Sequence, residues 1–269
     1  MRLQDKVILT TSAQNPCARA IVVGFAREGA ACVVVDEDAS QAERLAAEVR
    51  SLGRRALPLQ FDVKKKSQVE EMVRRAVAEC GRIDVLLNCS GVTYEDDFLT
   101  LTEDAFNECI DRGPKAYFLA CQVVGRRMAN QRSGKIINLT TTDGRIGSGQ
   151  SAGTSAAYSS IESMTRAIAQ ALGYYRVNVN SLVYGPMESF SGTAEEAGER
   201  LRRIPMGRLG KPEDLVGAAI FLATDDSNFV AGESLCVDAG YSNAAVTEDS
   251  FRPAWARTWG KFEIPPRSE

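Results

Sequence analysis

The segment VILTTSAQNPCARAIVVGFAREGAACVVVD, from Val7 to Asp36, decides the fold. An apolar, β-branched run from Val7 to Thr10 precedes a helical pattern from about Pro16 to Glu28, and a second β-branched run occupies Cys32 to Asp36. Strands that alternate with helical segments in this way are typical of βαβ units and of a parallel sheet. The segment therefore predicts that an α/β domain begins with the first strand.

The same alternation continues along the chain and predicts the remaining elements. The further strands are expected at Ala56–Asp62, Val85–Asn88, Ile136–Leu139, Val177–Leu182 and Leu235–Asp238. Two capping boxes, Ser40 with Glu43 and Ser67 with Glu70, predict the starts of two helices, and a long helix is expected over Lys115–Asn130. We therefore predict a single doubly wound, Rossmann-type parallel sheet of about seven strands, flanked by helices.

The last 27 residues differ from the rest of the chain. Residues 243–269 are rich in Pro and Arg and contain both tryptophans, Trp255 and Trp259. Two Trp side chains in a polar segment suit docking onto another surface, but a segment folded back on its own domain is equally consistent. We therefore treat 1–242 as one domain and 243–269 as an extension that packs on this domain or on a neighbouring subunit.

Composition excludes several functional classes. A net charge of −3 gives no electrostatic reason to expect nucleic acid or an anionic membrane as a partner. No apolar run is long enough for a membrane span, so we expect a cytoplasmic protein. The chain has seven cysteines without a C-x-x-C pair and no histidine, so we expect no metal site and exclude an imidazole base.

Several local sequences resemble the short-chain dehydrogenase/reductase family of classical type, over roughly Lys6 to Ser242. The matching stretches are Val7–Ala20, Asp62-Val63, Asn88-Cys89-Ser90-Gly91, Asn180-Ser181-Leu182 before Tyr184-Gly185, Gly207–Asp214 and Val237–Tyr241. The resemblance implies a Rossmann fold, and it implies an oxidoreductase that uses a nicotinamide dinucleotide.

The turn after the first strand departs from the family pattern Thr-Gly-x-x-x-Gly-x-Gly. It reads Thr11-Ser12-Ala13-Gln14-Asn15-Pro16-Cys17-Ala18, so Ser12, Pro16 and Ala18 replace the glycines that let a backbone approach a pyrophosphate. A side chain at Ser12 would be strained if the turn needs a positive φ. Pro16 lacks an N–H that could face phosphate, although it suits the first turn of a helix. We therefore favour a turn without a ligand, with weakened dinucleotide binding as the alternative.

The adenosine side of the implied cofactor site is better retained. Asp36 ends the second strand, where a carboxylate can accept both ribose hydroxyls and repel a 2′-phosphate. The resemblance also places Asp62, Val63 and Asn88 beside the cofactor. A bound cofactor should therefore be NAD rather than NADP, and we expect either no cofactor or weakly bound NAD. Asp36 as a solvated strand end and Asp62 as a loop cap are the alternatives.

The resemblance also gives positions for the family's catalytic Asn, Ser, Tyr and Lys. A gapless register places there Gly113, Thr141, Thr154 and Tyr158. Taking Tyr158 as the catalytic tyrosine would put Glu162 in place of the lysine and would require a gap. Only Thr141 keeps the family chemistry, a hydroxyl donor. Thr154 is too weak an acid to replace a phenol, and Tyr158 cannot supply the lysine's positive charge.

Three functional interpretations follow. The first is a non-catalytic subunit of an NAD-dependent alcohol or carbonyl dehydrogenase, in a homo- or hetero-oligomer, because the resemblance implies tetramers in which an inactive chain can accompany an active one. The second is a cofactor-independent enzyme with acid/base chemistry around Tyr158. The third is a residual NAD-dependent oxidoreductase that relies on Thr141. No motif identifies a substrate.

The second interpretation would draw on side chains close to Tyr158. Thr141, Asp143 and Glu162 are the candidates, and Arg112 could join them. Each also has an ordinary structural explanation. Asp143 would be a turn residue, Glu162 would lie on the exposed face of its helix, and Arg112 would form a surface ion pair.

Overall fold

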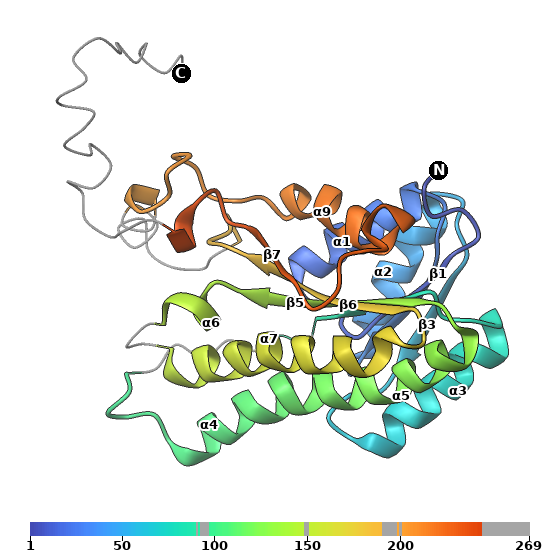
Figure 1. Ribbon diagram of the computed structural model, residues 1–269, viewed down its shortest axis with the longest axis horizontal. Coiled ribbons are helices and arrows are strands. Elements are labelled where there is room, and N and C mark those ends of the chain that lie inside the picture. Colours follow the sequence, from blue (N-terminus) through green and yellow to red (C-terminus); the bar gives the residue numbers. More distant parts are fainter. Residues whose placement is uncertain (90, 92–96, 148–150, 190–197, 199–200, 244–269) are drawn as a thin grey trace, which may run out of the picture.

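Seven parallel strands form one sheet in the order β3-β2-β1-β4-β5-β6-β7 (Figure 1). The computed structural model describes residues 1–89, 91, 97–147, 151–189, 198 and 201–243. The strands are β1 Val7–Thr10, β2 Ala31–Asp36, β3 Ala56–Gln60, β4 Val85–Asn88, β5 Gly134–Thr141, β6 Val177–Tyr184 and β7 Ser234–Val237. The predicted doubly wound parallel sheet is confirmed.

Helices cover both faces of the sheet (Figure 1). They are α1 Pro16–Arg27, α2 Ala39–Ser51, α3 Lys66–Cys80, α4 Glu103–Ile110, α5 Ala116–Gln131, α6 Asp143–Ile146, α7 Ala152–Gly173 and α9 Val216–Ala223. Neighbouring strand residues alternate between two cores. Ile8 packs in the core that contains α1, α2 and α9, whereas Leu9 packs in the core that contains α3, α5 and α7. Strands buried on both faces explain the continuous apolar runs in the sequence.

The order of the strands positions the functional site. The chain proceeds outward from β1 to β3, returns to β4 beside β1, and then proceeds in the other direction. Ligands of open α/β sheets bind where the strand order reverses, outside the carboxyl ends of the strands. In this protein that place lies between the loops that follow β1 and β4.

The two predicted capping boxes are wrong. The N-cap of α2 is Asp38, whose carboxylate accepts a hydrogen bond of 2.8 Å from Ser40 N. Helix α3 begins at Lys66, one residue before Ser67, and its N-cap has no side-chain hydrogen bond. In both cases the helix begins before the serine that the pattern selected. A Ser-x-x-Glu pattern therefore does not locate a helix start when an earlier residue takes the N-cap position.

Helix α4 was not predicted, and it continues into α5 through a π-helical turn at Asp111–Lys115. Pro114 in this turn has no N–H to donate, and it disfavours helical ψ at the preceding Gly113. Gly113 is buried and adopts φ −86° and ψ −111°. The expected helix over Lys115–Asn130 is therefore the second half of a longer, kinked helical segment.

Two absences concern only the part of the chain that the structure describes. No helix there has both the length and the apolar character needed to cross a bilayer. That part also contains no cluster of three or more His, Cys, Asp or Glu side chains placed to share a metal ion. Trp255 and Trp259 fall in 244–269, outside the described residues, so the docking of this extension stays a prediction.

Candidate functional site

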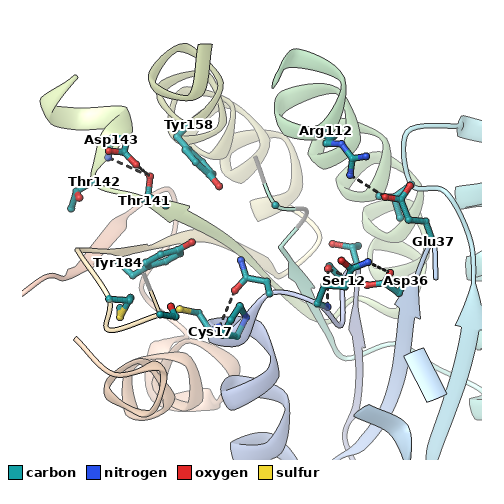
Figure 2. Close-up of a pocket in the computed structure, with 18 of the residues that line it drawn as sticks. Ser12, Cys17, Asp36, Glu37, Arg112, Thr141, Thr142, Asp143, Tyr158 and Tyr184 are labelled. Carbon is teal, nitrogen blue, oxygen red and sulfur yellow. Dashed lines mark hydrogen bonds and ion pairs between the residues drawn. The ribbon is translucent and has the colours of Figure 1, made fainter. Parts of the chain in front are cut away.

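A cleft of ≈ 700 Å³ lies at the carboxyl edge of the sheet (Figure 2). We call its two ends the β2 end and the β5 end after the strands that lead into them. The β2 end is lined by Asp36, Glu37, Asp62, Val63, Lys64 and Arg112. The β5 end is lined by Thr141, Thr142, Asp143, Tyr158 and Tyr184. The turn between β1 and α1 runs along the cleft and connects the two ends.

Asn15 caps helix α1 at the centre of this turn. Its Oδ1 accepts hydrogen bonds from Cys17 N at 2.9 Å and from Ala18 N at 3.1 Å. Pro16 occupies the first helical position and has no N–H. The amide donors at this helix N-terminus are therefore already bonded. The expected strain at Ser12 is not found, because Ser12 is not among the residues with a positive φ.

Asp36 is buried, with 3% of its surface exposed, and its carboxylate is surrounded by donors of the same chain. Oδ2 accepts from Ala13 N at 2.8 Å and from Ser12 Oγ at 3.2 Å. Oδ1 accepts from Gln14 Nε2 at 2.9 Å and from Asp38 N at 3.0 Å. The alternative of a solvated strand end is therefore wrong. Asp36 has the position expected of a ribose acceptor, but four donors of the protein use its oxygens.

An alternating charge network crosses the β2 end. Arg112 Nη1 lies 3.0 Å from Glu37 Oε1, and Arg112 Nε also donates to Glu108. Lys64 Nζ lies 3.7 Å from a carboxylate oxygen of each glutamate. Figure 2 shows the Arg112–Glu37 pair joining opposite sides of the cleft. The expected ion pair at Arg112 is confirmed. Arg112 also lines the cleft, but at the β2 end, whereas Tyr158 lies at the β5 end.

Asp62 and Val63 line the β2 end, as the resemblance implied. Asp62 accepts a hydrogen bond of 3.0 Å from Lys64 N and pairs with Lys65 Nζ at 3.2 Å. Burial tends to raise the pKa of Asp62, but these hydrogen bonds and the two lysine charges outweigh it and lower the pKa. Asp62 therefore caps its own loop while facing the cleft.

Asn88 does not line the cleft. It is buried at the end of β4, where Nδ2 donates to Asn138 Oδ1 at 3.0 Å and to Cys121 Sγ at 3.2 Å. Asn138 in turn donates to Thr165 Oγ1 at 2.8 Å. Asn88 thus belongs to a polar network that joins β4, β5 and α7, and its amide is oriented by that network.

At the β5 end, Thr141 and Asp143 are bonded to each other. Thr141 Oγ1 donates to Asp143 Oδ2 at 2.8 Å and accepts from Asp143 N at 3.3 Å. The hydroxyl hydrogen of Thr141 therefore points to a carboxylate in this structure. A ligand carbonyl at this end would have to displace Asp143 to receive that hydrogen.

Two phenols face the cleft from opposite walls. Tyr158 comes from α7 and Tyr184 from the end of β6 (Figure 2). Burial, with a smaller contribution from nearby Tyr158, raises the pKa of Tyr184 well above its ordinary value. Tyr184 is therefore protonated near neutral pH and can donate a hydrogen bond, but it cannot serve as a base.

Thr154 and Gly113 do not line the cleft. Thr154 is 3% exposed and makes a side-chain hydrogen bond with Cys109. Gly113 lies in the kink between α4 and α5. Of the four catalytic positions that the resemblance assigned, only Thr141 and Tyr158 face the cleft.

Glu162 was expected on the exposed face of its helix, and this is wrong. It is 7% exposed, and its Oε2 lies 2.9 Å from Arg145 Nη2 and 3.0 Å from Arg145 Nε. Helix α6 packs against α7 and covers this face. Glu162 does not line the cleft, so it cannot act together with Tyr158.

Sequence reasoning missed the roles of Gln14 and Asn15. Asn before Pro at a helix start is a recognisable N-cap signal, so the role of Asn15 could have been predicted. The contact of Gln14 with Asp36 has no local pattern, because the two residues are distant in the sequence and meet only in the folded turn.

The cap at Asn15 gives a first prediction. Replacing Asn15 by alanine is expected to lower the free energy of unfolding by about 1 kcal/mol, because two amides of α1 lose their acceptor. Chemical denaturation measures this loss. The matched control is Asn107→Ala, an exposed position within α4, which should be neutral or slightly stabilising. Equal stabilities of the two variants would contradict the cap.

Comparisons with known proteins agree with this geometry. A sequence model for a family described as enoyl-(acyl carrier protein) reductase matches residues 13–242. The chain is 32% identical to the 3-oxoacyl-(acyl-carrier-protein) reductase FabG of Thermotoga maritima, over 89% of this chain and 99% of that protein. It is 33% identical to a (hydroxy(phenyl)methyl)succinyl-CoA dehydrogenase subunit, BbsD, of Thauera aromatica, over 90% and 98% of the two chains.

A solved structure is also similar. A gluconate 5-dehydrogenase of Burkholderia cenocepacia, in complex with NADP and tartrate, superimposes with a TM-score of 0.87 at 28% identity. The match covers 91% of this chain and 98% of that one. The similarity therefore extends over most of the chain.

Proposed function

The chain belongs to the short-chain dehydrogenase/reductase family of oxidoreductases, and we propose that it is a subunit of a dehydrogenase complex without chemistry of its own. One observation carries the proposal. Thr154, at the position of the family's acid/base tyrosine, is buried against Cys109 and does not face the cleft. An aliphatic hydroxyl is also too weak an acid to donate a proton near neutral pH.

The charges of the cleft support the same proposal. The only lysine and arginine among the described residues that line it are Lys64 and Arg112, and both belong to the charge network at the β2 end. Tyr158, which the register assigns to the position of the family's lysine, brings a phenol in place of an ammonium group to the β5 end. The described part of that end therefore has no cation to lower the pKa of a neighbouring acid.

The subunit role rests on the retained fold. The seven-stranded sheet and its covering helices are those of the family, and the relative from Thauera aromatica is itself named as a dehydrogenase subunit. We propose a partner with the same fold and an intact Tyr-x-x-x-Lys pair, in a homo- or hetero-oligomer. The extension 243–269, with its two tryptophans, is a candidate for contact with that partner.

Activity of the chain alone is the first test. We expect carbonyl reduction at least about a thousandfold slower than that of an active relative in the same assay, because acid/base catalysis contributes roughly 10²–10⁴-fold. The Thermotoga maritima reductase, assayed with its own substrate, is the positive control. Turnover by this chain within tenfold of that control, abolished by Thr141→Ala, would contradict the proposal.

Association is the second test. Tagged chain is co-expressed with a paralogue that has an intact Tyr-x-x-x-Lys pair, and the complex is isolated by affinity and size-exclusion chromatography. We expect a complex of constant stoichiometry whose turnover per complex is lost when the paralogue's tyrosine is replaced by phenylalanine. A chain that elutes alone, with the paralogue fully active without it, would count against the subunit role.

A cofactor-independent enzyme is the second candidate. Thr141, Asp143, Tyr158 and Tyr184 share the β5 end, so a carboxylate and phenols do meet around one cavity. Glu162 no longer belongs to this candidate, since it pairs with Arg145 away from the cleft. An isomerase or dehydratase activity that is lost in both Tyr158→Phe and Asp143→Asn would favour it over the subunit role.

A further inference from the structure

We propose that the turn between β1 and α1 carries internal substitutes for a dinucleotide. Gln14 takes the place of the adenosine ribose at Asp36, and Asn15 takes the place of the pyrophosphate at the N-terminus of α1. This inference concerns the β2 end and the turn. It is therefore independent of the proposed function, which rests on the β5 end.

The ribose position is occupied at Asp36. An acidic residue that ends the second strand of a Rossmann sheet accepts hydrogen bonds from ribose hydroxyls. Here Asp36 is buried and receives four hydrogen bonds, of which the one from Gln14 Nε2 at 2.9 Å comes from a long, flexible and exposed side chain. The other three donors are backbone amides or the short side chain of Ser12. Gln14 is therefore the donor that a ribose hydroxyl would have to replace.

The pyrophosphate position is occupied at the start of α1. Phosphate binds a helix N-terminus through amide donors and the helix dipole. Cys17 N and Ala18 N both donate to Asn15 Oδ1, and Pro16 contributes no N–H. Asn15 also forms a side-chain hydrogen bond with Tyr184, which ties the cap to the end of β6. An anion at this point would meet a neutral amide oxygen in place of free donors.

An ion pair between Arg112 and Glu37 also lies across the β2 end. The 3.0 Å pair between Arg112 and Glu37 links the turn before α5 to the residue that follows Asp36. About a third of the Arg112 side chain is exposed, so this pair alone is a weak barrier. It adds to the two substitutes, because a ligand that displaced Gln14 would also meet this pair. The donors and acceptors of the turn therefore do not fit a dinucleotide in this structure.

Each substitute can be removed separately, so the binding of a ribose and the binding of a pyrophosphate can be tested one at a time. Gln14→Ala removes one of the two hydrogen bonds to Asp36 Oδ1, which keeps the one from Asp38 N, and leaves the cap intact. Asn15→Gly frees the two amides of α1, and glycine at an N-cap costs a helix little. Adenosine probes the ribose position without an anion, and inorganic pyrophosphate probes the helix N-terminus without a ribose. Binding is measured by calorimetry and by the shift in melting temperature.

We expect no binding of either probe to the wild type at about 1 mM, which is on the order of the highest common KM values of enzymes. Gln14→Ala should gain adenosine binding by tenfold or more and leave pyrophosphate unchanged. Asn15→Gly should gain pyrophosphate binding by tenfold or more and leave adenosine unchanged. The double variant should bind ADP more tightly than either single variant. Gln170→Ala and Asn107→Ala, at exposed helix positions, should behave as the wild type.

Two results would overturn the inference. The first is wild-type binding of adenosine or pyrophosphate at micromolar concentration. The second is unchanged binding in both single variants while circular dichroism shows them folded. Because the readout is binding and not turnover, an inactive wild type that binds ADP tightly would overturn this inference and leave the proposed function standing. A wild type that converts a substrate without any nicotinamide cofactor would overturn the proposed function and leave this inference standing.

Discussion

Replacing Gly144 by alanine is expected to lower the free energy of unfolding by about 2–3 kcal/mol, although alanine is the better helix former. Gly144 lies in α6, where it faces the first half of α7. A Cβ at this position would lie 2.8 Å from Ser159 N and 2.9 Å from the carbonyl carbon of Tyr158. These are backbone atoms of a helix, so they cannot turn aside as the end of a side chain can. Helix α6 would have to move away from α7.

The displacement would reach the β5 end of the cleft. Ser159 Oγ donates to the carbonyl oxygen of Gly144, so the two helices are also joined by a hydrogen bond at the point of contact. Tyr158 is the preceding residue and faces the cleft, while Asp143 precedes Gly144 and bonds to Thr141. A shift between the helices would therefore change the distance between the phenol and the carboxylate.

Chemical denaturation of Gly144→Ala and of a matched glycine tests this contact. The control is Gly173→Ala, at the end of α7, where an added Cβ would meet no atom within 4 Å. Alanine there should be neutral or stabilising by up to about 1 kcal/mol, because glycine is unfavourable in a helix. If both variants had the same stability, the close approach of α6 and α7 would be wrong.

The fold could be predicted because its signals are local. A buried parallel strand such as β4 reads as a short apolar run, and the helix that follows reads as an apolar stripe, whatever their partners. The beginning of α2 could not be predicted in the same way. Asp38 and Ser40 both suit an N-cap, and the choice between them depends on how the chain leaves β2.

The sequence could predict which positions belong to the site, but not the contacts that their side chains make. The register assigned Thr141 and Tyr158 to catalytic positions of the family, and both side chains line the cleft. The register could not show that Thr154 turns to Cys109, because a short side chain at a tyrosine position packs wherever its hydroxyl finds a partner. Nor could it show that Gln14 reaches Asp36, since such contacts depend on tertiary geometry.

Replacing Arg145 by leucine is expected to lower the free energy of unfolding by about 3 kcal/mol. The change leaves the carboxylate of Glu162 without its partner, although only 9% of that side chain is exposed. Removing one member of a buried ion pair typically costs about 3–5 kcal/mol. We expect the lower end of this range, because about a third of the Arg145 side chain is exposed. The variant would also lose the 3.2 Å hydrogen bond from Arg145 Nη2 to the carbonyl oxygen of Ser234, which joins α6 to β7.

The double variant Arg145→Leu with Glu162→Leu separates the two causes. If the loss comes from an unpaired buried carboxylate, the double variant should regain most of the stability, because a buried pair can often be replaced by apolar side chains at little cost. Arg74→Leu is the control, since its pair with Glu71 is exposed to solvent and should contribute little to stability. A loss in Arg145→Leu no larger than in this control would mean that Glu162 is hydrated in solution.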